Sequence, residues 1–508
     1  MHRPTESPVT VGCNTQLYWS NAPRRTIDLA FERRVGILRL MRKTKIICTL
    51  GPASESSDVI ERMIKAGANL FRLNMSHANH EWVREIVPRV RALARGFEES
   101  VGILLDTQGP AIRTGTLSEQ LVLAVGDVLE ITVHGERATE QNSITSNYDQ
   151  LAEDVSVGDV ILLDNGLMQV RVLAKGDNRI KTEVLTAGSL GSRRHINLPG
   201  IDVKLPALTE KDLKDLELGI ELGVDFVALS FTRRKEDLDQ LRRVLRSGGS
   251  HAAVVAKVET QSAVQAIDDI IHGSDVILIA RGDLGIECPL EELPIIQRRI
   301  VKRCLRIGKP VIVATQLLES MIHNPVPTRA EVTDVANAVF EQADAIMLTG
   351  ETTGGRYPTE CVEVLDRVAQ RIERSGGAGY GKDALLEDPR QKIVASAVSL
   401  VDSLHRARIV VFTRHGTMAR YVSNLRPGQG PIFAFAPDED VCSQLSVCWG
   451  VCPILLEFSD DPNDTIEAAE KYLRQRKLVQ PNDHLVVLSD VRAGEALVDC
   501  VQLRHVEA

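Results

Sequence analysis

The stretch 253–259, Ala-Val-Val-Ala-Lys-Val-Glu, is a short apolar β-branched run that ends in a lysine and an acid. A run of this length and composition, bounded by polar residues, is typical of a strand that is buried on both faces of a parallel sheet. Lys257 and Glu259 then lie at the carboxyl edge of that sheet. In a β/α barrel, this edge is where the chemistry collects.

Seven further runs share this character, and most are followed by amphipathic stretches such as 57–66 and 210–222. With 253–257, the eight runs are 45–49, 69–73, 101–106, 226–230, 276–280, 311–314 and 345–348. Their number, and the polar group at most of their ends, distinguish them from an open doubly wound sheet. They predict an α/β protein built on a parallel (β/α)8 TIM barrel.

Two segments interrupt or follow this repeat, so several domains are expected. Between the third and fourth runs, short alternating strands are punctuated by turn signals such as Asn165-Gly166. They predict a small all-β domain inserted at 113–206. A Gly-rich break at 375–379 precedes renewed helix and strand alternation, which predicts a C-terminal α/β domain over 375–508. The barrel is then assigned to 42–112 and 207–374.

Residues 1–41 contain prolines and paired arginines and show no sustained periodicity. We expect this N-terminal extension to be either disordered or the product of an incorrectly assigned start, with Met41 as the true first residue. A regulatory or targeting extension is the alternative.

Composition limits the classes of partner. The 508 residues carry 60 Lys and Arg against 69 Asp and Glu, and no basic run dominates, so a nucleic-acid partner is not expected. No apolar run approaches the roughly 18 residues of a membrane span. The nine cysteines have no Cys-x-x-Cys spacing, and their odd number argues against a disulfide framework. A reducing cytoplasmic location without a membrane partner is predicted.

Polar side chains follow the predicted strands in every part of the barrel. They are Arg72, Asn74, Ser76, Asp106, Thr107, Ser230, Lys257, Glu259, Arg281, Gly282, Asp283, Thr315 and 349–351. Acids and cations beside hydroxyls suit a polyanion whose phosphate and carboxylate oxygens are neutralised by metal and cations. The inventory argues against hydride transfer or acyl transfer.

Glu259 and Asp283 follow consecutive strands, which lie about 5 Å apart in a sheet. Two carboxylates so placed can share one divalent ion, and Mg2+ prefers sparse protein ligation completed by substrate. Salt bridges to Lys257 and Arg281 are the alternative use of these acids. Lys257 itself is interpreted either as a Schiff-base nucleophile or as a fixed cation on a phosphoryl group.

Two further groups of residues suggest ligands. Arg281-Gly282-Asp283-Leu284-Gly285 predicts a tight turn into a helix, with backbone N–H groups that suit a small carboxylate. An ordinary loop is the alternative. Asn74, Ser76, Asp106 and Thr107 offer oxygen ligands for a weakly held monovalent cation.

Six motifs in order make the sequence from Lys43 to the end resemble the pyruvate kinase family. They are 44–54, 72–77, 252–264, 281–285, 314–321 and 347–352. The resemblance implies phosphoryl transfer from phosphoenolpyruvate to ADP, giving pyruvate and ATP, the last step of glycolysis. It also implies a requirement for Mg2+ or Mn2+.

The resemblance further implies a role for each matching residue. Glu259 and Asp283 would hold Mg2+, and Lys257 would stabilise the phosphoryl group with help from Arg72. Gly282, Asp283 and Thr315 would hold the substrate carboxylate, and Thr315 would belong to the relay that protonates C3. Asn74, Arg113 and Arg194 would contact the nucleotide, although the family commonly has a lysine at position 194. The inserted β domain would close as a lid.

The resemblance also implies a K+ site formed by Asn74, Ser76, Asp106 and Thr107, next to two departures from the family pattern. Gln108 and Ala111 stand where the family usually has Lys and Glu. In the family, Glu at the position of Ala111 accompanies K+ dependence and Lys accompanies K+ independence. Because Ala111 is neither, we expect an active enzyme with an altered cation requirement, and loss of activity is the alternative.

In the C-terminal domain, Thr413-Arg414-His415-Gly416-Thr417 resembles the family's effector phosphate loop, and a plain strand-to-helix turn is the alternative. A sugar-phosphate or nucleotide effector is expected. The resemblance also implies a homotetramer, and a final hairpin at 490–504 with no appended phosphotransfer-type domain. An aldolase-type lyase and a non-catalytic metabolite sensor are the rival functions.

Overall fold

The computed structural model describes residues 42–97, 100–133, 135–201, 203–493 and 496–507. The expectations for residues 1–41 therefore fall outside the described residues.

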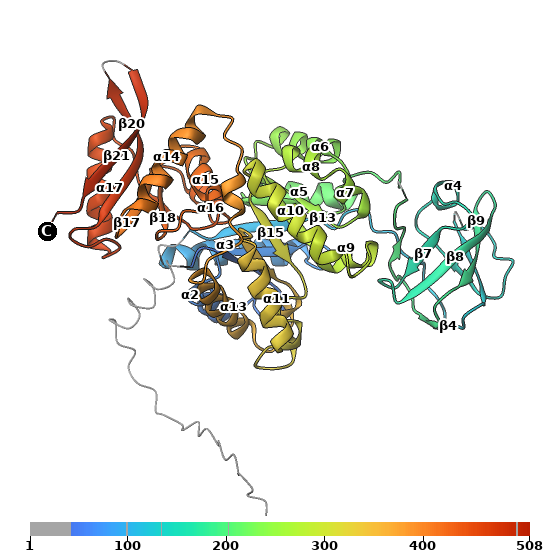
Figure 1. Cartoon of the computed structure of the whole chain (residues 1–508). Coiled ribbons are helices and arrows are strands. Elements are labelled where there is room, and N and C mark those ends of the chain that lie inside the picture. The colour runs from blue at the N-terminus through green and yellow to red at the C-terminus, as the bar shows by residue number, and fades with distance from the viewer. Residues whose placement is uncertain (1–41, 98–99, 134, 202, 494–495, 508) are drawn as a thin grey trace, which may run out of the picture.

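A closed barrel of eight parallel strands occupies the centre of the molecule (Figure 1). Its strands are β1 (Lys45–Thr49), β2 (Leu70–Asn74), β3 (Gly102–Asp106), β12 (Phe226–Leu229), β13 (Ala253–Val258), β14 (Val276–Ala280), β15 (Val311–Ala314) and β16 (Ala345–Leu348). β1 pairs with both β2 and β16 and so closes the barrel. The predicted TIM barrel is confirmed, because each strand begins within one residue of a predicted run.

Helices and short helical turns link the barrel strands. They are α2 (Ser57–Ala66), α3 (His80–Gly96), α5 (Glu210–Glu221), α6 (Lys235–Ser247), α7 (Gln261–Gln265), α8 (Ile267–Gly273), α9 (Arg281–Glu287), α10 (Leu293–Ile307), η1 (Glu319–Ile322), α11 (Arg329–Phe340), α12 (Gly350–Thr353), α13 (Pro358–Glu373) and η2 (Tyr380–Asp383). Local signals set their ends. Ser56 caps α2 by accepting a hydrogen bond from Val59 N, and Gly67, with φ of 109°, ends it. Thr209 and Asp212 form a capping box at α5.

A small β domain is inserted between β3 and β12. It contains β4 (Leu121–Leu123), β5 (Val128–Thr132), β6 (Ser143–Thr145), α4 (Leu151–Asp154), β7 (Val160–Leu163), β8 (Met168–Lys175), β9 (Arg179–Val184), β10 (Gly188–Leu190) and β11 (Ile196–Asn197). The sequence pattern predicts strands at 121–123, 128–133, 160–163, 167–172 and 181–185, close to β4, β5, β7, β8 and β9, and does not predict β6, β10, β11 or α4. The domain has its own core, which includes Leu129, Ile161 and Val170.

A five-stranded sheet in the order β19-β18-β17-β20-β21 forms the C-terminal domain. Its elements are α14 (Pro389–Ser403), β17 (Ala407–Phe412), α15 (Thr417–Asn424), β18 (Ile432–Ala436), α16 (Glu439–Leu445), β19 (Val451–Leu455), α17 (Pro462–Gln475), β20 (His484–Ala493) and β21 (Ala496–His505). The final hairpin begins earlier than the predicted residue 490, because β20 pairs with β17 over 484–488 before it turns.

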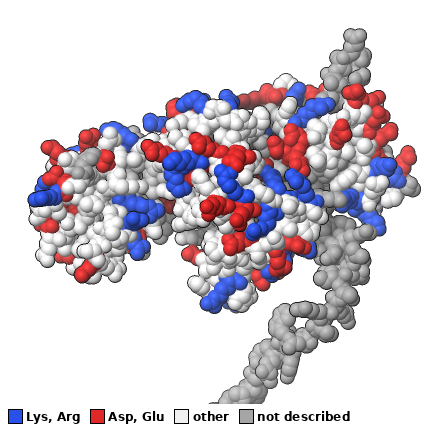
Figure 2. Space-filling view, turned by 180° about the vertical axis from the view of Figure 1, so that it is seen from behind, with Lys and Arg blue, Asp and Glu red and all other residues white. Residues whose placement is uncertain are grey.

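The C-terminal domain and the β domain lie on opposite sides of the barrel (Figure 1). On the face shown in Figure 2, acidic and basic side chains are interspersed over the barrel and both neighbouring domains. None of the described helices is both long enough and apolar enough to cross a membrane.

Candidate active site

Asp106 lies between two cations at the carboxyl end of the barrel. Arg72, on β2, donates from Nε to Asp106 Oδ2 at 2.7 Å, and Lys257 Nζ, from β13, lies 3.2 Å from Oδ1. Burial of Asp106 disfavours its charged form, but the positive charges of Lys257 and Arg72 outweigh this effect and hold its pKa below the ordinary value. Asp106 is therefore an anion that fixes the positions of both cations.

Lys257 contacts two more groups. Its Nζ lies 2.9 Å from Glu259 Oε1 and donates to Ser230 Oγ at 2.7 Å. Burial alone would lower the pKa of Lys257, but the carboxylates of Asp106 and Glu259 raise it above the ordinary value. Lys257 is consequently a buried ammonium that stays charged.

Glu259 and Asp283 follow neighbouring strands, because Val258 pairs with Ile279 near the ends of β13 and β14. Glu259 is 2% exposed and accepts a hydrogen bond from Phe231 N at 2.6 Å. Burial raises the pKa of Glu259 to about 7, against the opposing charge of Lys257, and the negative charge of Asp283 adds to the rise. The negative charge of Asp283 therefore adds to the cost of ionising Glu259, and a cation near both acids would offset it.

Gly282 and Thr315 are brought together as predicted. Gly282 N donates to Thr315 Oγ1 at 2.7 Å, and that hydroxyl donates to Ala314 O at 2.7 Å. Thr315 has φ of 69°, which is unusual for a β-branched residue and typical of functional sites. Arg281 stabilises the turn by donating to Thr315 O at 2.7 Å.

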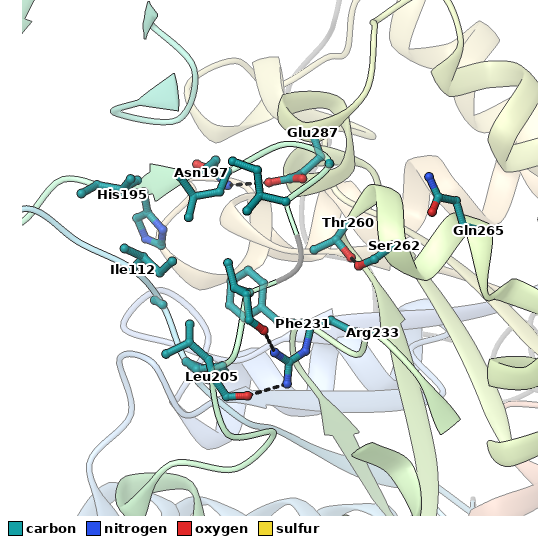
Figure 3. Close-up of a pocket in the computed structure, with 17 residues that line it drawn as sticks. Ile112, His195, Asn197, Leu205, Phe231, Arg233, Thr260, Ser262, Gln265 and Glu287 are labelled. Atoms are coloured by element: carbon teal, nitrogen blue, oxygen red, sulfur yellow. Dashed lines mark hydrogen bonds between the residues drawn. The ribbon is translucent and has the colours of Figure 1, made fainter. Parts of the chain in front are cut away.

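One local expectation is corrected. Residues 281–285 do not form a turn before a helix, because α9 already begins at Arg281, after Ala280. Asp283 and Glu287 are therefore four residues apart on the same short helix, and the Glu287 side chain points toward Asn197 of the β domain (Figure 3).

The four residues predicted to hold a monovalent cation lie at adjacent strand ends. Asn74 is directly opposite Asp106 in the β2–β3 pairing, and Asn74 Oδ1 accepts from Ser76 N at 3.2 Å. The Thr107 hydroxyl is already engaged, because it donates to Ala228 O at 3.0 Å and accepts from Ser230 N at 3.1 Å. The backbone carbonyl of Thr107 is engaged as well, because it accepts from Ser230 Oγ at 2.6 Å.

Gln108 and Ala111 lie on the segment that leaves the barrel for the β domain. Gln108 N and Gly109 N both donate to Asp212 Oδ1, at 3.0 and 3.1 Å. The main chain at this departure from the family pattern is thus anchored to α5. Ala111 follows the anchored residues and lines a pocket instead of presenting a charge.

The two arginines predicted to contact the nucleotide belong to the β domain and its edge. Arg113 donates to Arg193 O at 3.0 Å, and its backbone pairs with that of His195. Arg194 lies 3.4 Å from Asp164 Oδ1 and is largely exposed. In this arrangement the described polar partners of both side chains are within the β domain, not at the barrel mouth.

A pocket of about 270 Å³ lies where the β domain meets the barrel (Figure 3). Asn197 Nδ2, from the β domain, donates to Glu287 Oε1 on α9 at 3.4 Å. Arg233 donates to Val203 O at 2.6 Å and to Leu205 O at 2.7 Å, and so ties the returning segment to the barrel. Burial raises the pKa of Glu287 to about 7.

The sequence analysis did not predict Asn197, Arg233 or Glu287 at this joint. Glu287 could have been found, because it lies one helical turn after Asp283 in a segment already expected to be helical. Asn197 and Arg233 carried no such signal, because neither follows a barrel strand directly and their partners are distant in sequence.

The predicted effector residues lie on the turn between β17 and α15. Thr413 N donates to Phe435 O at 3.0 Å, and Gly416 has φ of 78° immediately before α15 begins at Thr417. The Arg414 guanidinium lies over the Phe458 ring, 5.2 Å from its centroid. The turn places Thr413, Arg414, His415, Gly416 and Thr417 on one short segment at the end of β17.

Comparison with known proteins gives the same family over both large domains. The family described as pyruvate kinase, barrel domain, matches residues 41–362, and the one described as pyruvate kinase, alpha/beta domain, matches residues 391–501. A pyruvate kinase of Sporosarcina psychrophila is 40% identical over 469 residues, which cover 90% of this chain and 79% of that protein.

Two further relatives are also pyruvate kinases. A pyruvate kinase of Staphylococcus aureus strain MRSA252 is 38% identical over 467 residues, which cover 90% of this chain and 79% of the relative. Plastidial pyruvate kinase 3, chloroplastic, of Arabidopsis thaliana is 38% identical over 450 residues, which cover 88% and 78%. The chain therefore belongs to the pyruvate kinase family, phosphotransferases that pass the phosphoryl group of phosphoenolpyruvate to ADP.

Proposed function

We propose that Lys257 and Arg72 stabilise the phosphoryl group as it passes from phosphoenolpyruvate to ADP. The observation that carries this proposal is the buried Lys257 ammonium, held charged by Asp106 and Glu259. A fixed cation in a site that excludes water stabilises charge that develops on phosphoryl oxygens. Arg72 is held through the same Asp106, so the two cations can act on one group from different strands.

The same observation argues against the rival role of Lys257. A Schiff-base lysine must be neutral to attack a carbonyl, and such lysines are activated by a lowered pKa. Here the neighbouring carboxylates raise the pKa of Lys257. An aldolase-type lyase therefore has no suitable nucleophile at this position.

Glu259 and Asp283 are the residues that would hold Mg2+, or Mn2+ in its place. Among the described residues, no group of three or more His, Cys, Asp or Glu side chains is arranged to hold a metal. A buried Glu259 whose ionisation is made more costly by Asp283 nevertheless fits a divalent ion that would take its remaining ligands from substrate and water. When bound, such an ion neutralises charge on the enolate and phosphoryl oxygens.

Gly282, Asp283 and Thr315 would receive the substrate carboxylate. The Gly282 N–H and the Thr315 hydroxyl now bond to each other, and a carboxylate oxygen can replace the hydroxyl as the acceptor for Gly282 N. The Thr315 hydroxyl, which donates to Ala314 O at 2.7 Å, would then have a free lone pair through which it can accept a proton in the relay to C3 of the enolate.

Arg113, Arg194 and Asn74 would contact the nucleotide after the β domain closes over the barrel. Closure would move Arg113 and Arg194 from partners within their own domain to the phosphates and would exclude water from the transfer. Asn74, Ser76, Asp106 and Thr107 remain the proposed K+ site. Ala111 adds no charge there, so the cation requirement is proposed to differ from that of relatives with an acid at this position.

The broader biological proposals rest on family resemblance. We place the enzyme in the cytoplasm as a homotetramer and assign the turn from Thr413 to Thr417 to the phosphate of a sugar-phosphate or nucleotide effector. The exposed Arg414 and the start of α15 supply suitable phosphate partners there.

The activity is tested by measuring pyruvate formation from phosphoenolpyruvate and ADP with Mg2+, with and without K+. Turnover in at least one condition is expected. Folded protein that gives no turnover in either condition would contradict an active enzyme, and a metabolite sensor would then be the better interpretation.

Lys257→Met tests the central role. We expect turnover to fall by at least about 10³-fold, because the charge that faces the transferring group is removed. Mg2+-dependent binding of phosphoenolpyruvate, followed by calorimetry, should persist. Lys65→Met, at an exposed lysine paired with Glu61, is the matched control and should keep full turnover. A Lys257→Met enzyme with wild-type turnover would refute the role.

A further inference from the structure

The loop that follows β12 provides two contacts to the catalytic groups that no role assigned above explains. Ser230 Oγ accepts from Lys257 Nζ at 2.7 Å, and Phe231 N donates to Glu259 Oε2 at 2.6 Å. These consecutive residues thus hold the proposed phosphoryl-stabilising lysine and one proposed metal ligand. Ser230 is 3% exposed, so its hydroxyl is committed to the protein interior.

The direction of the Ser230 hydroxyl follows from its partners. Its single proton has a carbonyl acceptor, Thr107 O, at 2.6 Å, and a longer contact of 3.3 Å to Asp106 Oδ1. Because a hydroxyl has one proton and two acceptor lone pairs, donation to Thr107 O leaves a lone pair for the Lys257 ammonium. Ser230 therefore connects Lys257 to the carbonyl of Thr107.

The backbone of this loop is strained and closely packed, so the hydroxyl has little freedom to move. Phe231 has φ of 52°, in the left-handed region that a bulky residue rarely adopts. A Cβ on Gly109 would lie 2.9 Å from both Ser230 Cβ and the Phe231 ring, closer than real contacts. The loop and residue 109 can therefore approach only because residue 109 is glycine.

We infer that Ser230 is a positioning residue for phosphoryl transfer, which acts by holding the Lys257 ammonium at a set place and angle. The described partners of Lys257 are the carboxyl groups of Asp106 and Glu259 and the neutral hydroxyl of Ser230. A neutral acceptor fixes an ammonium without cancelling its charge, so the cation keeps its field toward the phosphoryl group. The inference rests on the role proposed for Lys257.

Ser230→Ala and Ser230→Thr test the inference against a control from the same loop. The Thr232 hydroxyl is also buried, but it donates to the backbone carbonyl of Leu229 at 2.9 Å, so Thr232→Val removes a hydroxyl of structural use only. We expect Ser230→Ala to lower kcat by about 10- to 100-fold, since a misplaced catalytic group costs on this order. The KM for phosphoenolpyruvate should stay within about threefold, Ser230→Thr should recover most of kcat, and Thr232→Val should stay close to wild type.

A double-mutant cycle distinguishes action through Lys257 from a general loss of structure. Lys257→Arg should leave a low, measurable rate, and adding Ser230→Ala to it should lower that rate by less than about threefold, because residues that act as a unit are not additive. Circular dichroism and thermal melting verify folding. If Ser230→Ala does not fold, Ser230→Cys replaces it, because it keeps the shape but is a weak acceptor.

Two results would overturn the inference. One is a Ser230→Ala (or Ser230→Cys) enzyme with kcat within twofold of wild type, and the other is an equal loss in Thr232→Val. These results are separable from failure of the proposed function. If the proposed function itself were wrong, either wild-type protein would show no turnover, or Lys257→Met would remain active whatever residue occupies position 230.

Discussion

The barrel is joined to its two neighbouring domains in different ways. Toward the C-terminal domain, the side chains that fill the barrel and those of the domain form one continuous apolar cluster, which includes Ile47 and Phe226 from the barrel and Val401 and Ile409 from the domain. The β domain instead has a separate core. The first joint is therefore part of a shared core, and the second consists of two connecting segments and a pocket.

The polar contacts follow the same division. At the C-terminal joint, Arg426 and Asp344 are each 3% exposed and form an ion pair of 2.6 Å. Trp449 N also donates to Asp344 Oδ1 at 3.1 Å. At the β-domain joint, Arg233 donates to Val203 O and Leu205 O on the returning segment at 2.6 and 2.7 Å, and Asn197 reaches Glu287 at 3.4 Å across a pocket.

The difference indicates which domain can move during the reaction. Rotation of the C-terminal domain would expose shared apolar surface and separate a buried ion pair, and both changes are costly. Rotation of the β domain about its two connecting segments breaks the long Asn197–Glu287 hydrogen bond and reshapes a pocket, whereas the Arg233 contacts are to one of those segments. The β domain is thus the more loosely joined of the two, which suits the lid role proposed for it.

Among the changes that test this comparison of the two joints, Arg426→Met should lower stability the most. It removes the cation and leaves Asp344 buried, which costs about 3–5 kcal/mol in comparable pairs. We expect calorimetry to show a clear fall in the melting temperature of the barrel and C-terminal domain. The multidomain chain makes the melting temperature a safer readout than a two-state free energy.

Arg390→Met is the matched control for the preceding change. Its partner Asp499 lies 3.3 Å away, but Arg390 is largely exposed, so the pair should contribute under about 1 kcal/mol. If the two variants lower the melting temperature equally, the C-terminal joint is not specially stabilised and the comparison fails.

Glu287→Gln should change how stability depends on pH at the β-domain joint. The folded pKa of Glu287 is about 7, above the ordinary 4.5, so folding favours the protonated acid. Its contribution is fully present below pH 4.5 and is lost as pH rises to about 7, by at most roughly 3 kcal/mol. Relative to wild type, Glu287→Gln should therefore be more stable at pH 8 than at pH 5.

Melting temperatures at both pH values measure this effect. Glu291→Gln, at an exposed position on the loop before α10, is the control and should show little pH-dependent difference from wild type. If the difference in melting temperature between Glu287→Gln and wild type is the same at both pH values, burial does not raise the pKa of Glu287 in solution.

Asn197→Ala should have the smallest effect. It removes a single long hydrogen bond between the β domain and α9, so we expect a loss of under about 1 kcal/mol and turnover within about threefold. A loss above about 2 kcal/mol would mean that the β domain is held to the barrel much more firmly than the structure indicates.

The candidate site residues could be located from sequence because each lies at or just after the end of an apolar strand. Lys257, Glu259, Asp106 and Thr315 all end or follow apolar runs, and the eightfold repeat assigns them to one edge of the barrel. The start of α9 at Arg281 was not predicted, because glycines in 281–285 suggested a turn. The short strands β6, β10 and β11 were missed because each contains a single apolar side chain, whereas β4, which also has only three residues, is apolar throughout.

The sequence by itself determined the barrel, the inserted and C-terminal domains, and the family to which the chemistry belongs. Those features follow from local periodicity and from motifs a few residues long. Only the tertiary structure decided the partners of each group, such as Ser230 with Lys257 or Arg426 with Asp344, which are 27 and 82 residues apart. Such pairs form only when barrel closure and domain packing bring residues that are distant in sequence within hydrogen-bond distance. A local sequence pattern carries no information about which distant residues will meet.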